Sequence, residues 1–596
     1  MKGVISCREA ISSKRTPTEP SSTYEFGTGY CKYELGVDKF VDGRTVCLAL
    51  GQARFESKAL QERAATLGCA AAWLSAYREH GVFAPRGVRG RFAVIVFNGD
   101  DSSAWLAVDR FNTYPLCHAA SESTLAVATR ADEVSIEDRS IAPQAIFNYL
   151  YFHMIPAPQT VFSGISRLEA GHMLHWQQGK VRIERYWVPT FAPDKTLDLD
   201  VSKGRFLEII ENAVRTEADG TRPGAFLSGG TDSSTVSGML CKVLGGPAPT
   251  YSIGFDAAGY DEMAYARIAA KRFGTEHHEY YVTPSDLLEG IPKVGMHYDQ
   301  PFGNSSAVPA WLCATQARKD GITRILAGDG GDELFGGNSR YAKQRIFGIY
   351  DAVPGLLRSA MVEPVLRIPG MDRIPLLKKA VSYVSQAQVP MPDRMGMYNL
   401  LWRLGLENVL TPDFLAQIQP DVPLLAQREA WKLSEGQTLV NRMLELDWKF
   451  TLADNDLPKV LGTTELAGIE VGFPLLSDEL LEFSLTLPSE WKLKGFTLRW
   501  FFKEALRGFL PDEIIAKKKH GFGLPFGVWA SQDEGLKAMA RESLDSFKKR
   551  GIVRAAFLDE LLETLLPAHP GYYGEMVWIL QMLEFWLQKH APEFRL

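Results

Sequence analysis

Cysteine is scarce in this chain of 596 residues, which has seven of them and no Cys-x-x-Cys pair. A sparse, odd-numbered set argues against a disulfide framework or a structural zinc site. The chain also lacks an apolar signal-like segment near its start, and it has no uninterrupted apolar run near the ~20 residues that span a bilayer. These absences predict a cytoplasmic protein with reduced thiols and no membrane span.

An excess of basic charge is absent too, since 65 lysines and arginines stand against 71 aspartates and glutamates, for a net charge of −6. This composition has no electrostatic footprint for a nucleic-acid partner, and none is predicted. Internal repeats are not visible. The length exceeds one ordinary hydrophobic core and therefore predicts two or more domains.

The texture of the sequence changes along the chain. Short β-type runs separated by turn residues predict a sheet-rich N-terminal domain over residues 1–189. Residues 190–200 are largely polar and contain Pro193, so we interpret them as a linker. From residue 201, helical runs alternate with short buried-strand runs, which is typical of a parallel, doubly wound α/β sheet. The last part reads as mostly helical, and we assign residues 201–596 to one domain.

One segment between a strand and a helix, "AFLSGGTDSST" at 225–235, has the composition of an anion cradle. Ligands of open parallel sheets bind at the carboxyl ends of strands, where helix N-termini also favour anions. Gly229 and Gly230 allow close approach of backbone amides, while Ser228 and Ser233 add hydroxyl donors. Asp232 would repel a pyrophosphate unless it holds Mg²⁺. The alternative is an ordinary glycine turn with a polar helix cap.

A second acidic, glycine-rich turn follows another strand-like run, in "LAGDGGDELFGG" at 326–337. It contains Asp329, Asp332 and Glu333. Taken alone, it could be a calcium-type or plain surface turn. Together with the first loop it predicts one nucleotide site built from two strand ends, with Asp232 and Asp332 sharing the magnesium ion.

These loops occur with other segments in the order and spacing of the asparagine synthetase family, which the chain resembles over most of residues 205–586. The other segments are "SIGF" at 252–255, "YDEMAYARIAAKRFGTEHHE" at 260–279, "DQPFGNSSAVP" at 299–309 and "KKKHGFGLPFGVW" at 517–529. More weakly, "GRFAVIVFNGDDSSAWLAVDRFNTYPL" at 90–116 is similar to the glutaminase domain of these enzymes. The resemblance implies an N-terminal Ntn-type αββα sandwich, followed by a doubly wound parallel-sheet ATP-pyrophosphatase domain with a largely helical C-terminal part.

The glutaminase nucleophile of the family is a cysteine directly after the initiator methionine, but Lys2 stands there in this chain. A lysine does not replace a thiolate whose base is the free α-amine. Cys7 could substitute only if six residues were removed, and the family's Asn-Gly-Glu segment for glutamine is not evident. We therefore expect the N-terminal domain to be an inactive glutaminase.

For the synthetase half, the resemblance implies that ATP activates a carboxylate as an acyl-adenylate with release of pyrophosphate. An amine then attacks, which yields an amide and AMP. The implied ATP and pyrophosphate site comprises Leu227, Ser228, Gly229, Gly230, Asp232, Ser233, Ile253, Gly328 and Lys459, with Asp232 and Asp332 as the metal ligands.

Three further residues have implied roles in the chemistry. Lys519 matches a lysine near the developing oxyanion, although it could be one member of a solvated run at 517–519. Asp329 and Glu470 are candidates for the base that deprotonates the amine. For Glu470 the alternative is a structural ion pair.

The chain differs from the family at positions whose charged side chains are expected to recognise the substrate. Leu461 and Gly462 stand in place of an Asp-Arg pair, Gly472 replaces a later arginine, and Ser477 replaces an aspartate. These losses favour a larger or less charged acyl substrate, such as a peptide, in a pocket opened by the glycines, and a substrate amine in place of ammonia.

That pattern resembles macrolactam (lasso-peptide) cyclases and β-lactam synthetases. A companion biosynthetic protein is a possible partner. Two alternatives stay open: an asparagine synthetase that uses ammonia or glutamine, and an inactive nucleotide-binding scaffold.

Overall fold

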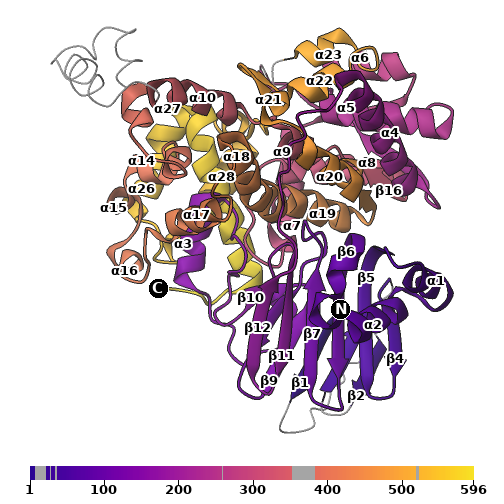
Figure 1. Ribbon diagram of the computed structural model, residues 1–596. Helices are drawn as coiled ribbons and strands as arrows, with labels where there is room; N and C mark the ends of the chain where they lie inside the picture. The colour runs from indigo at the N-terminus through magenta and orange to yellow at the C-terminus, as the bar shows by residue number, and fades with distance from the viewer. Residues whose placement is uncertain (7–21, 27–28, 34–35, 258, 352–382, 518–522) are drawn as a thin grey trace.

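The computed structural model describes residues 1–6, 22–26, 29–33, 36–257, 259–351, 383–517 and 523–596. In this part of the chain, two stacked antiparallel sheets form the N-terminal third, and a parallel sheet with many helices forms the remainder (Figure 1). Within the described ranges, no helix is both long enough and apolar enough to cross a membrane.

Each of the two N-terminal sheets has six described strands, in the orders β10-β8-β9-β1-β3-β2 and β12-β11-β7-β6-β5-β4. The strands are β1 (Lys2–Ser6), β2 (Ser22–Phe26), β3 (Gly29–Tyr33), β4 (Asp38–Asp42), β5 (Thr45–Phe55), β6 (Val88–Asn98), β7 (Ser103–Val108), β8 (Cys117–Ala120), β9 (Thr124–Ala128), β10 (Ser166–Arg167), β11 (His172–Gln177) and β12 (Lys180–Arg185). The helices beside them are α1 (Lys58–Leu67), α2 (Cys69–His80) and α3 (Pro143–Phe152).

Alternation of side chains along these strands explains the layers. Ile95 of β6 packs with Val127 of β9 in the core between the two sheets. Its neighbour Val94 points the opposite way and packs with Trp73 of α2. On the outer face of the first sheet, Ala126 joins the core that contains α3. The predicted αββα sandwich is confirmed.

The segment after the sandwich is tied to the second half of the protein. No helix or strand is described between Arg185, the last residue of β12, and Leu199, the first of α4 (Leu199–Ala218). The amide nitrogen of Asp194 donates to the carbonyl oxygen of Thr486 at 2.8 Å. Asp198 caps α4 by accepting from the amide of Val201 at 2.9 Å. The division at residues 190–200 stays a prediction, but this segment is packed against its neighbours.

The second half is built on a parallel sheet in the order β15-β14-β13-β16-β17. Its strands are β13 (Pro223–Phe226), β14 (Pro249–Phe255), β15 (Glu276–Val282), β16 (Arg324–Leu326) and β17 (Glu470–Gly472). The chain runs from β13 to β14 on one side and returns to β16 on the other side of β13. The predicted doubly wound parallel sheet is confirmed, and its topological switch point lies between β13 and β16.

Helices pack against the strands of this sheet and fill the remainder of the chain (Figure 1). Those before residue 352 are α5 (Thr231–Leu244), α6 (Met263–Phe273), α7 (Pro284–His297), α8 (Ala307–Lys319), α9 (Gly331–Phe335) and α10 (Ser339–Asp351). Those after residue 382 include α14 (Leu400–Leu404), α15 (Leu406–Val409), α16 (Pro412–Leu415), α17 (Val422–Leu433), α18 (Leu439–Asp447), a π-helix (Trp448–Asp456), α19 (Leu457–Ala467), α20 (Asp478–Thr486), α21 (Ser489–Lys492), α22 (Trp500–Ala505), α23 (Asp512–Ala516), α24 (Phe526–Ala530), α25 (Glu534–Lys548), α26 (Ala555–Glu560), α27 (Leu566–Ala568) and α28 (Pro570–His590).

The C-terminal helix α28 runs through the middle of the helical part and joins it to the sandwich. Trp578 and Trp586 are fully buried, and their indole nitrogens donate to the carbonyl oxygens of Gly303 and Tyr298, each at 3.0 Å. The hydroxyl of Tyr149 on α3 donates to the carbonyl of Ile579 at 2.7 Å. The Tyr149 bond therefore ties α3 of the N-terminal part to α28 through a buried polar contact.

Candidate active site

Two acidic, glycine-rich turns meet at the switch point of the parallel sheet. The first follows β13 and leads into α5, and the second follows β16 and leads into α9. Because β13 and β16 are direct neighbours and parallel, their carboxyl ends open on the same edge. Helix α5 begins at Thr231, earlier than the sequence pattern predicts, so Asp232 and Ser233 lie in its first turn and not in a loop.

Glycine is required where these two turns contact their neighbours. Gly229 has φ 69°, and a Cβ there would lie 2.5 Å from the carbonyl carbon of Tyr265. A Cβ on Gly328 would lie 2.8 Å from the backbone nitrogen of Ser233. The second turn therefore packs directly on the first turn of α5, with only backbone between them.

Polar groups of the first turn are organised around Ser233. Its hydroxyl accepts from the backbone nitrogen of Ser228 at 3.1 Å and lies 3.0 Å from the Ser228 hydroxyl. Gly230 is the N-cap of α5 and supplies no side chain to the orphan amides of that helix. Leu227, Ile253 and Gly328, three residues of the implied ATP site, lie at the carboxyl ends of β13, β14 and β16, on the same edge of the sheet. This edge has the form of an anion cradle.

Asp232 and Asp332 come together at a third residue that sequence reasoning missed. Nη1 of Arg499 donates to Oδ2 of Asp232 at 2.6 Å and also to Oδ1 of Asp332. Nη2 of the same guanidinium donates to the hydroxyl of Thr231. Arg499 is 4% exposed, so this contact is formed inside the protein.

The backbone of Arg499 supports a special role for this residue. It has φ 54°, in the left-handed region that costs a non-glycine residue roughly 1–2 kcal/mol. The residue follows the short hairpin of β18 (Leu493–Lys494) and β19 (Thr497–Leu498) and precedes α22. Such conformations persist where the surroundings hold them, and they cluster at functional sites.

The carboxylate pair fits a magnesium ion. Oδ1 of Asp232 is buried and has no hydrogen-bond partner, although its companion oxygen is bound to Arg499. Proteins commonly hold Mg²⁺ through one or two carboxylates together with phosphate oxygens of the substrate. An unpartnered carboxylate oxygen beside an anion cradle satisfies that requirement.

A second charged cluster surrounds Lys459 on α19, just after the π-helix. Its ammonium nitrogen lies 3.4 Å from Oδ1 of Asp329 and 3.2 Å from Oδ1 of Asp456. Burial raises the pKa of Asp329, and Lys459 opposes that rise. Burial lowers the pKa of Lys459, but Asp456 and Asp329 outweigh it and raise that pKa overall. Burial, together with Asp456 and Asp447, also holds the pKa of Glu333 well above its usual range. The cluster can therefore hold or accept a proton.

Glu470, the other predicted base, does not belong to this cluster. It is the first residue of β17, and both Nε and Nη2 of Arg324 donate to its Oε2, at 3.1 and 2.6 Å. Arg324 is the first residue of β16, whereas Asp329 follows the carboxyl end of that strand. The structure thus places Glu470 in an ion pair with Arg324, the alternative considered for this residue, and its assignment as a base stays a prediction.

The basic run near the C-terminus begins inside the cradle. Lys519 lies outside the described residues. Lys517 is described, and its ammonium nitrogen lies 3.0 Å from Glu262, donates to the carbonyl of Gly229 at 3.4 Å and sits 4.5 Å from the ring centre of Tyr265. Its side chain is 8% exposed. The alternative of a solvated run therefore does not hold for Lys517.

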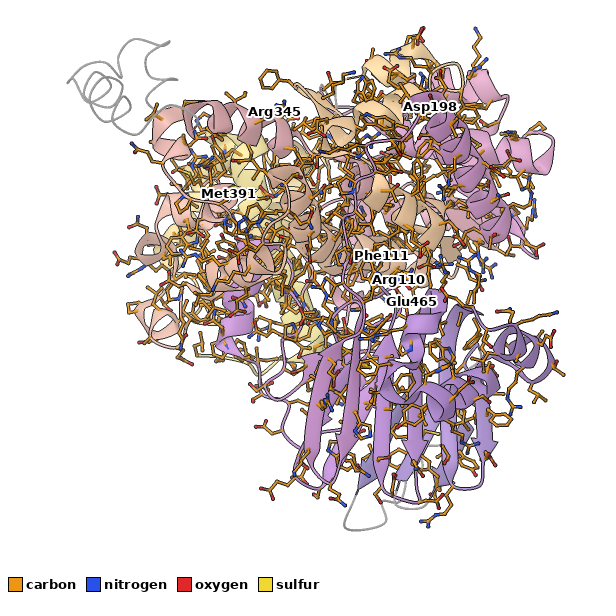
Figure 2. All side chains as sticks on the ribbon, in the orientation of Figure 1. Arg110, Phe111, Asp198, Arg345, Met391 and Glu465 are labelled. Carbon is orange, nitrogen blue, oxygen red and sulfur yellow. The ribbon has the colours of Figure 1, made fainter. Side chains whose placement is uncertain are left out.

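The sequence predicts a pocket opened by Gly462 and Gly472, where the chain differs from the family pattern. Neighbouring side chains fill part of that space. A Cβ on Gly462 would collide with the ring of Tyr298, and one on Gly472 would lie 2.7 Å from Oε2 of Glu217. Leu461, Gly462 and Tyr298 nevertheless line a cavity of about 790 Å³ between the sandwich and the synthetase half. Figure 2 labels Glu465, which also lines this cavity, at the junction of the two halves.

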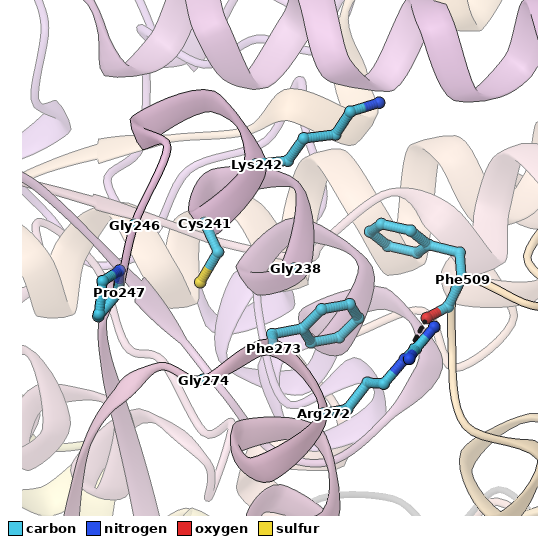
Figure 3. A pocket seen from close by; sticks show the side chains of 9 residues that line it. All are labelled: Gly238, Cys241, Lys242, Gly246, Pro247, Arg272, Phe273, Gly274 and Phe509. Carbon is cyan, nitrogen blue, oxygen red and sulfur yellow. Dashed lines mark hydrogen bonds between the residues drawn. The ribbon is translucent and has the colours of Figure 1, made fainter.

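A hollow of about 470 Å³ lies elsewhere, near the C-terminal part of α5 and α6 (Figure 3). Cys241, Lys242 and Phe273 line it, and Nε of Arg272 donates to the carbonyl of Phe509 at 3.2 Å. It therefore lies at the opposite end of α5 from the cradle, so we do not assign it to the nucleotide site.

The sandwich lacks an activated thiol among its described residues. Lys2 lies in β1, with its ammonium 3.8 Å from Glu133. Burial raises the thiol pKa of the described cysteines, to about 12 at Cys31 and about 11 at Cys117. Cys7 lies outside the described residues. Raised pKa values keep a thiol protonated and poorly nucleophilic.

The fold and the site together define a two-part protein of the amidotransferase type, with an Ntn-type sandwich joined to a parallel-sheet half. A family model described as asparagine synthase matches residues 205–588, and one described as a glutamine amidotransferase domain matches residues 52–187. The chain belongs to the asparagine synthase family.

Several curated proteins are similar to this chain over much of its length. An asparagine synthetase of Bacillus subtilis (strain 168), named as glutamine-hydrolysing, is 24% identical over 523 residues, which cover 86% of this chain and 79% of that protein. A putative asparagine synthetase of Mycobacterium bovis is 27% identical over 491 residues, covering 79% of this chain and 72% of that protein. A putative asparagine synthetase of Methanocaldococcus jannaschii is 30% identical over 321 residues, covering 52% and 61%.

Proposed function

We propose that this protein forms amide bonds at the expense of ATP. A carboxylate of the substrate attacks the α-phosphorus of ATP, which releases pyrophosphate and leaves an acyl-adenylate. An amine nitrogen then forms the C–N bond, the C–O bond to AMP breaks, and a proton leaves the amine. The observation that carries this proposal is the meeting of Asp232 and Asp332 beside the Gly229–Gly230 cradle at the switch point.

The residues of the cradle are suited to the first step. The N-terminus of α5 and the backbone at Gly229 and Gly230 would bind the phosphates of ATP. Asp232 and Asp332 would hold the magnesium ion that, when bound, neutralises charge on the leaving pyrophosphate. Lys459 carries a positive charge on the same edge of the sheet, and Lys519 is proposed to stabilise the tetrahedral oxyanion of the second step.

Asp329 is the proposed base of the second step. It needs to accept a proton from the attacking amine, and burial raises its pKa toward the range where a carboxylate does so effectively. Its contact with Lys459 at 3.4 Å keeps a share of the ionised form available. Asp456 shares the same ammonium and positions it between the two carboxylates.

The substrate that fits this account is a peptide or amino-acid derivative whose own amine closes the amide, as in macrolactam formation. Leu461 and Gly462 place no charge where free aspartate would be read, and both line the large cavity between the halves. Lys2 in β1 and the protonated thiols of the sandwich support an inactive glutaminase. An asparagine synthetase supplied with ammonia is the second candidate, favoured by the names of the relatives.

Pyrophosphate release from purified protein tests the proposal. ATP and Mg²⁺ would be combined in parallel with aspartate plus ammonia, aspartate plus glutamine, and a panel of peptides that carry a carboxylate and an amine. We expect release with a peptide and none with aspartate. Release with aspartate plus ammonia would establish the second candidate, and release in no mixture would favour a nucleotide-binding scaffold.

A further inference from the structure

Arg499 is bound to the two aspartates that the proposed function assigns to a metal ion. One nitrogen of its guanidinium, Nη1, bridges Oδ2 of Asp232 and Oδ1 of Asp332. The other terminal nitrogen binds the hydroxyl of Thr231. A guanidinium and a magnesium ion both seek these carboxylate oxygens, and both are cations.

The protein is built to place a guanidinium there. Arg499 directly follows the hairpin of β18 and β19, which positions it at the site. The Cζ atom of Arg499 lies 4.5 Å from the ring centre of Phe502. A Cβ on Gly337 would lie 2.7 Å from Cδ of Arg499, so glycine leaves the room that the arginine stem needs. The side chain is 5% exposed, which excludes an adventitious surface contact.

We propose that Arg499 is a resident counter-cation, which neutralises Asp232 and Asp332 in the nucleotide-free protein and yields them to magnesium when Mg²⁺–ATP binds. The displaced guanidinium is then beside a polyphosphate, which it matches in charge and in planar, bidentate geometry. Arg499 thereby makes metal binding depend on the nucleotide. Without ATP, Mg²⁺ must displace the guanidinium from the two carboxylates, and no phosphate is present as a new ion-pair partner for it.

This inference rests on the proposed function for its metal, but it can be tested without turnover. Thermal unfolding of the full chain is followed during a Mg²⁺ titration without ATP, for wild type and for Arg499→Met. The variant removes the charge and keeps much of the apolar stem. We expect its melting temperature to be lower without metal. The Mg²⁺ concentration at the midpoint of the titration should fall at least about tenfold, because a positive charge in contact with both carboxylates is removed.

Two further variants separate this effect from general destabilisation. Arg550→Met breaks another buried pair, with Glu584, far from the site, and should lower the melting temperature without changing the Mg²⁺ midpoint. Adding Asp232→Asn to Arg499→Met should remove the gain in Mg²⁺ response. If Arg499→Met does not fold, Arg499→Lys keeps a smaller donor set and should have a midpoint between wild type and the tenfold shift.

The outcomes are distinct. An unchanged or higher Mg²⁺ midpoint in the Arg499 variants would overturn the proposal and make the arginine a plain anchor of the two aspartates. A lowered midpoint in a protein that neither binds ATP nor releases pyrophosphate would uphold the counter-cation and reject the proposed function.

Discussion

Asp109 of the sandwich and Asp232 of the synthetase half differ in how their carboxylates are satisfied. In the sandwich, the carboxylate of Asp109 is saturated, since it accepts from the backbone amides of Phe92, Phe111 and Thr113. In the synthetase half, Oδ1 of Asp232 is buried without a partner and Lys459 is shared by two carboxylates. A carboxylate saturated by backbone amides stabilises a fold, whereas the unpartnered oxygen of Asp232 lies beside the anion cradle, where it can bind a ligand.

The comparison supports the proposal that the sandwich keeps its fold without glutaminase chemistry. The sandwich keeps its sheets and its docking to α28, although Lys2 stands where the family has its nucleophile. The parallel-sheet half keeps the two acidic turns and the glycines that allow them to touch. Removing chemistry should therefore have its largest effects in the second half and its smallest in the first.

The largest effect is expected at the two aspartates. Asp232→Asn and Asp332→Asn should each reduce pyrophosphate release at least about a hundredfold, because a metal site that neutralises phosphate charge contributes several kcal/mol. The double variant should be no worse than either single one, since both empty the same site. Circular dichroism would verify that the variants fold, and full activity in either would contradict the shared site.

Replacement of Lys519 should separate the two chemical steps. If the ammonium stabilises the tetrahedral oxyanion, Lys519→Ala should lower amide formation by on the order of 10²–10³ while ATP still binds. Lys517 is not a neutral control, because it contacts the cradle. The exposed Lys58 of α1 is the better control, and Lys58→Met should leave amide formation unchanged. Equal losses at both positions would argue against an oxyanion role.

A smaller effect, on stability, is expected at Lys492. This lysine is 1% exposed, its ammonium has no hydrogen-bond partner, and burial lowers its pKa to about 7. Between pH 7 and its ordinary value near 10.5, the unfolded chain binds a proton that the folded protein does not, so stability rises with pH there.

Lys492→Met should raise the melting temperature at pH 7 by roughly a few degrees. The gain should shrink toward pH 10, because the wild-type lysine is then neutral in both states. Melting curves across this range would measure it. A gain that is independent of pH would show that the buried charge is not its cause.

The smallest effect is expected in the sandwich. Purified protein should not release glutamate from glutamine above background, and Lys2→Ala should leave ATP-dependent amide formation unchanged. A coupled glutamate assay and the pyrophosphate assay measure these two quantities. Steady glutamine turnover would restore the sandwich as a working glutaminase and erase the contrast between the halves.

Much of this arrangement could be predicted from the sequence. The remainder could not be predicted, because it depends on contacts between residues far apart in the chain. Short β-type runs separated by turn residues predict the two sheets. The acidic turns after β13 and β16 can be recognised by their glycine and aspartate content. Arg499 could not be predicted, because its partners lie 167 and 267 positions away and no local pattern joins them. Glu470 resembled a base in its segment, but the register of β17 places it against Arg324.

The most direct test of the account follows the oxygen atoms of the substrate carboxylate. A substrate that supports pyrophosphate release would be labelled with ¹⁸O in that carboxylate, and AMP would be analysed by mass spectrometry. Formation of an acyl-adenylate predicts that AMP gains one ¹⁸O atom and that the amide keeps the other. Label in inorganic phosphate with ADP as the nucleotide product, or product formed without label in AMP, would contradict the account.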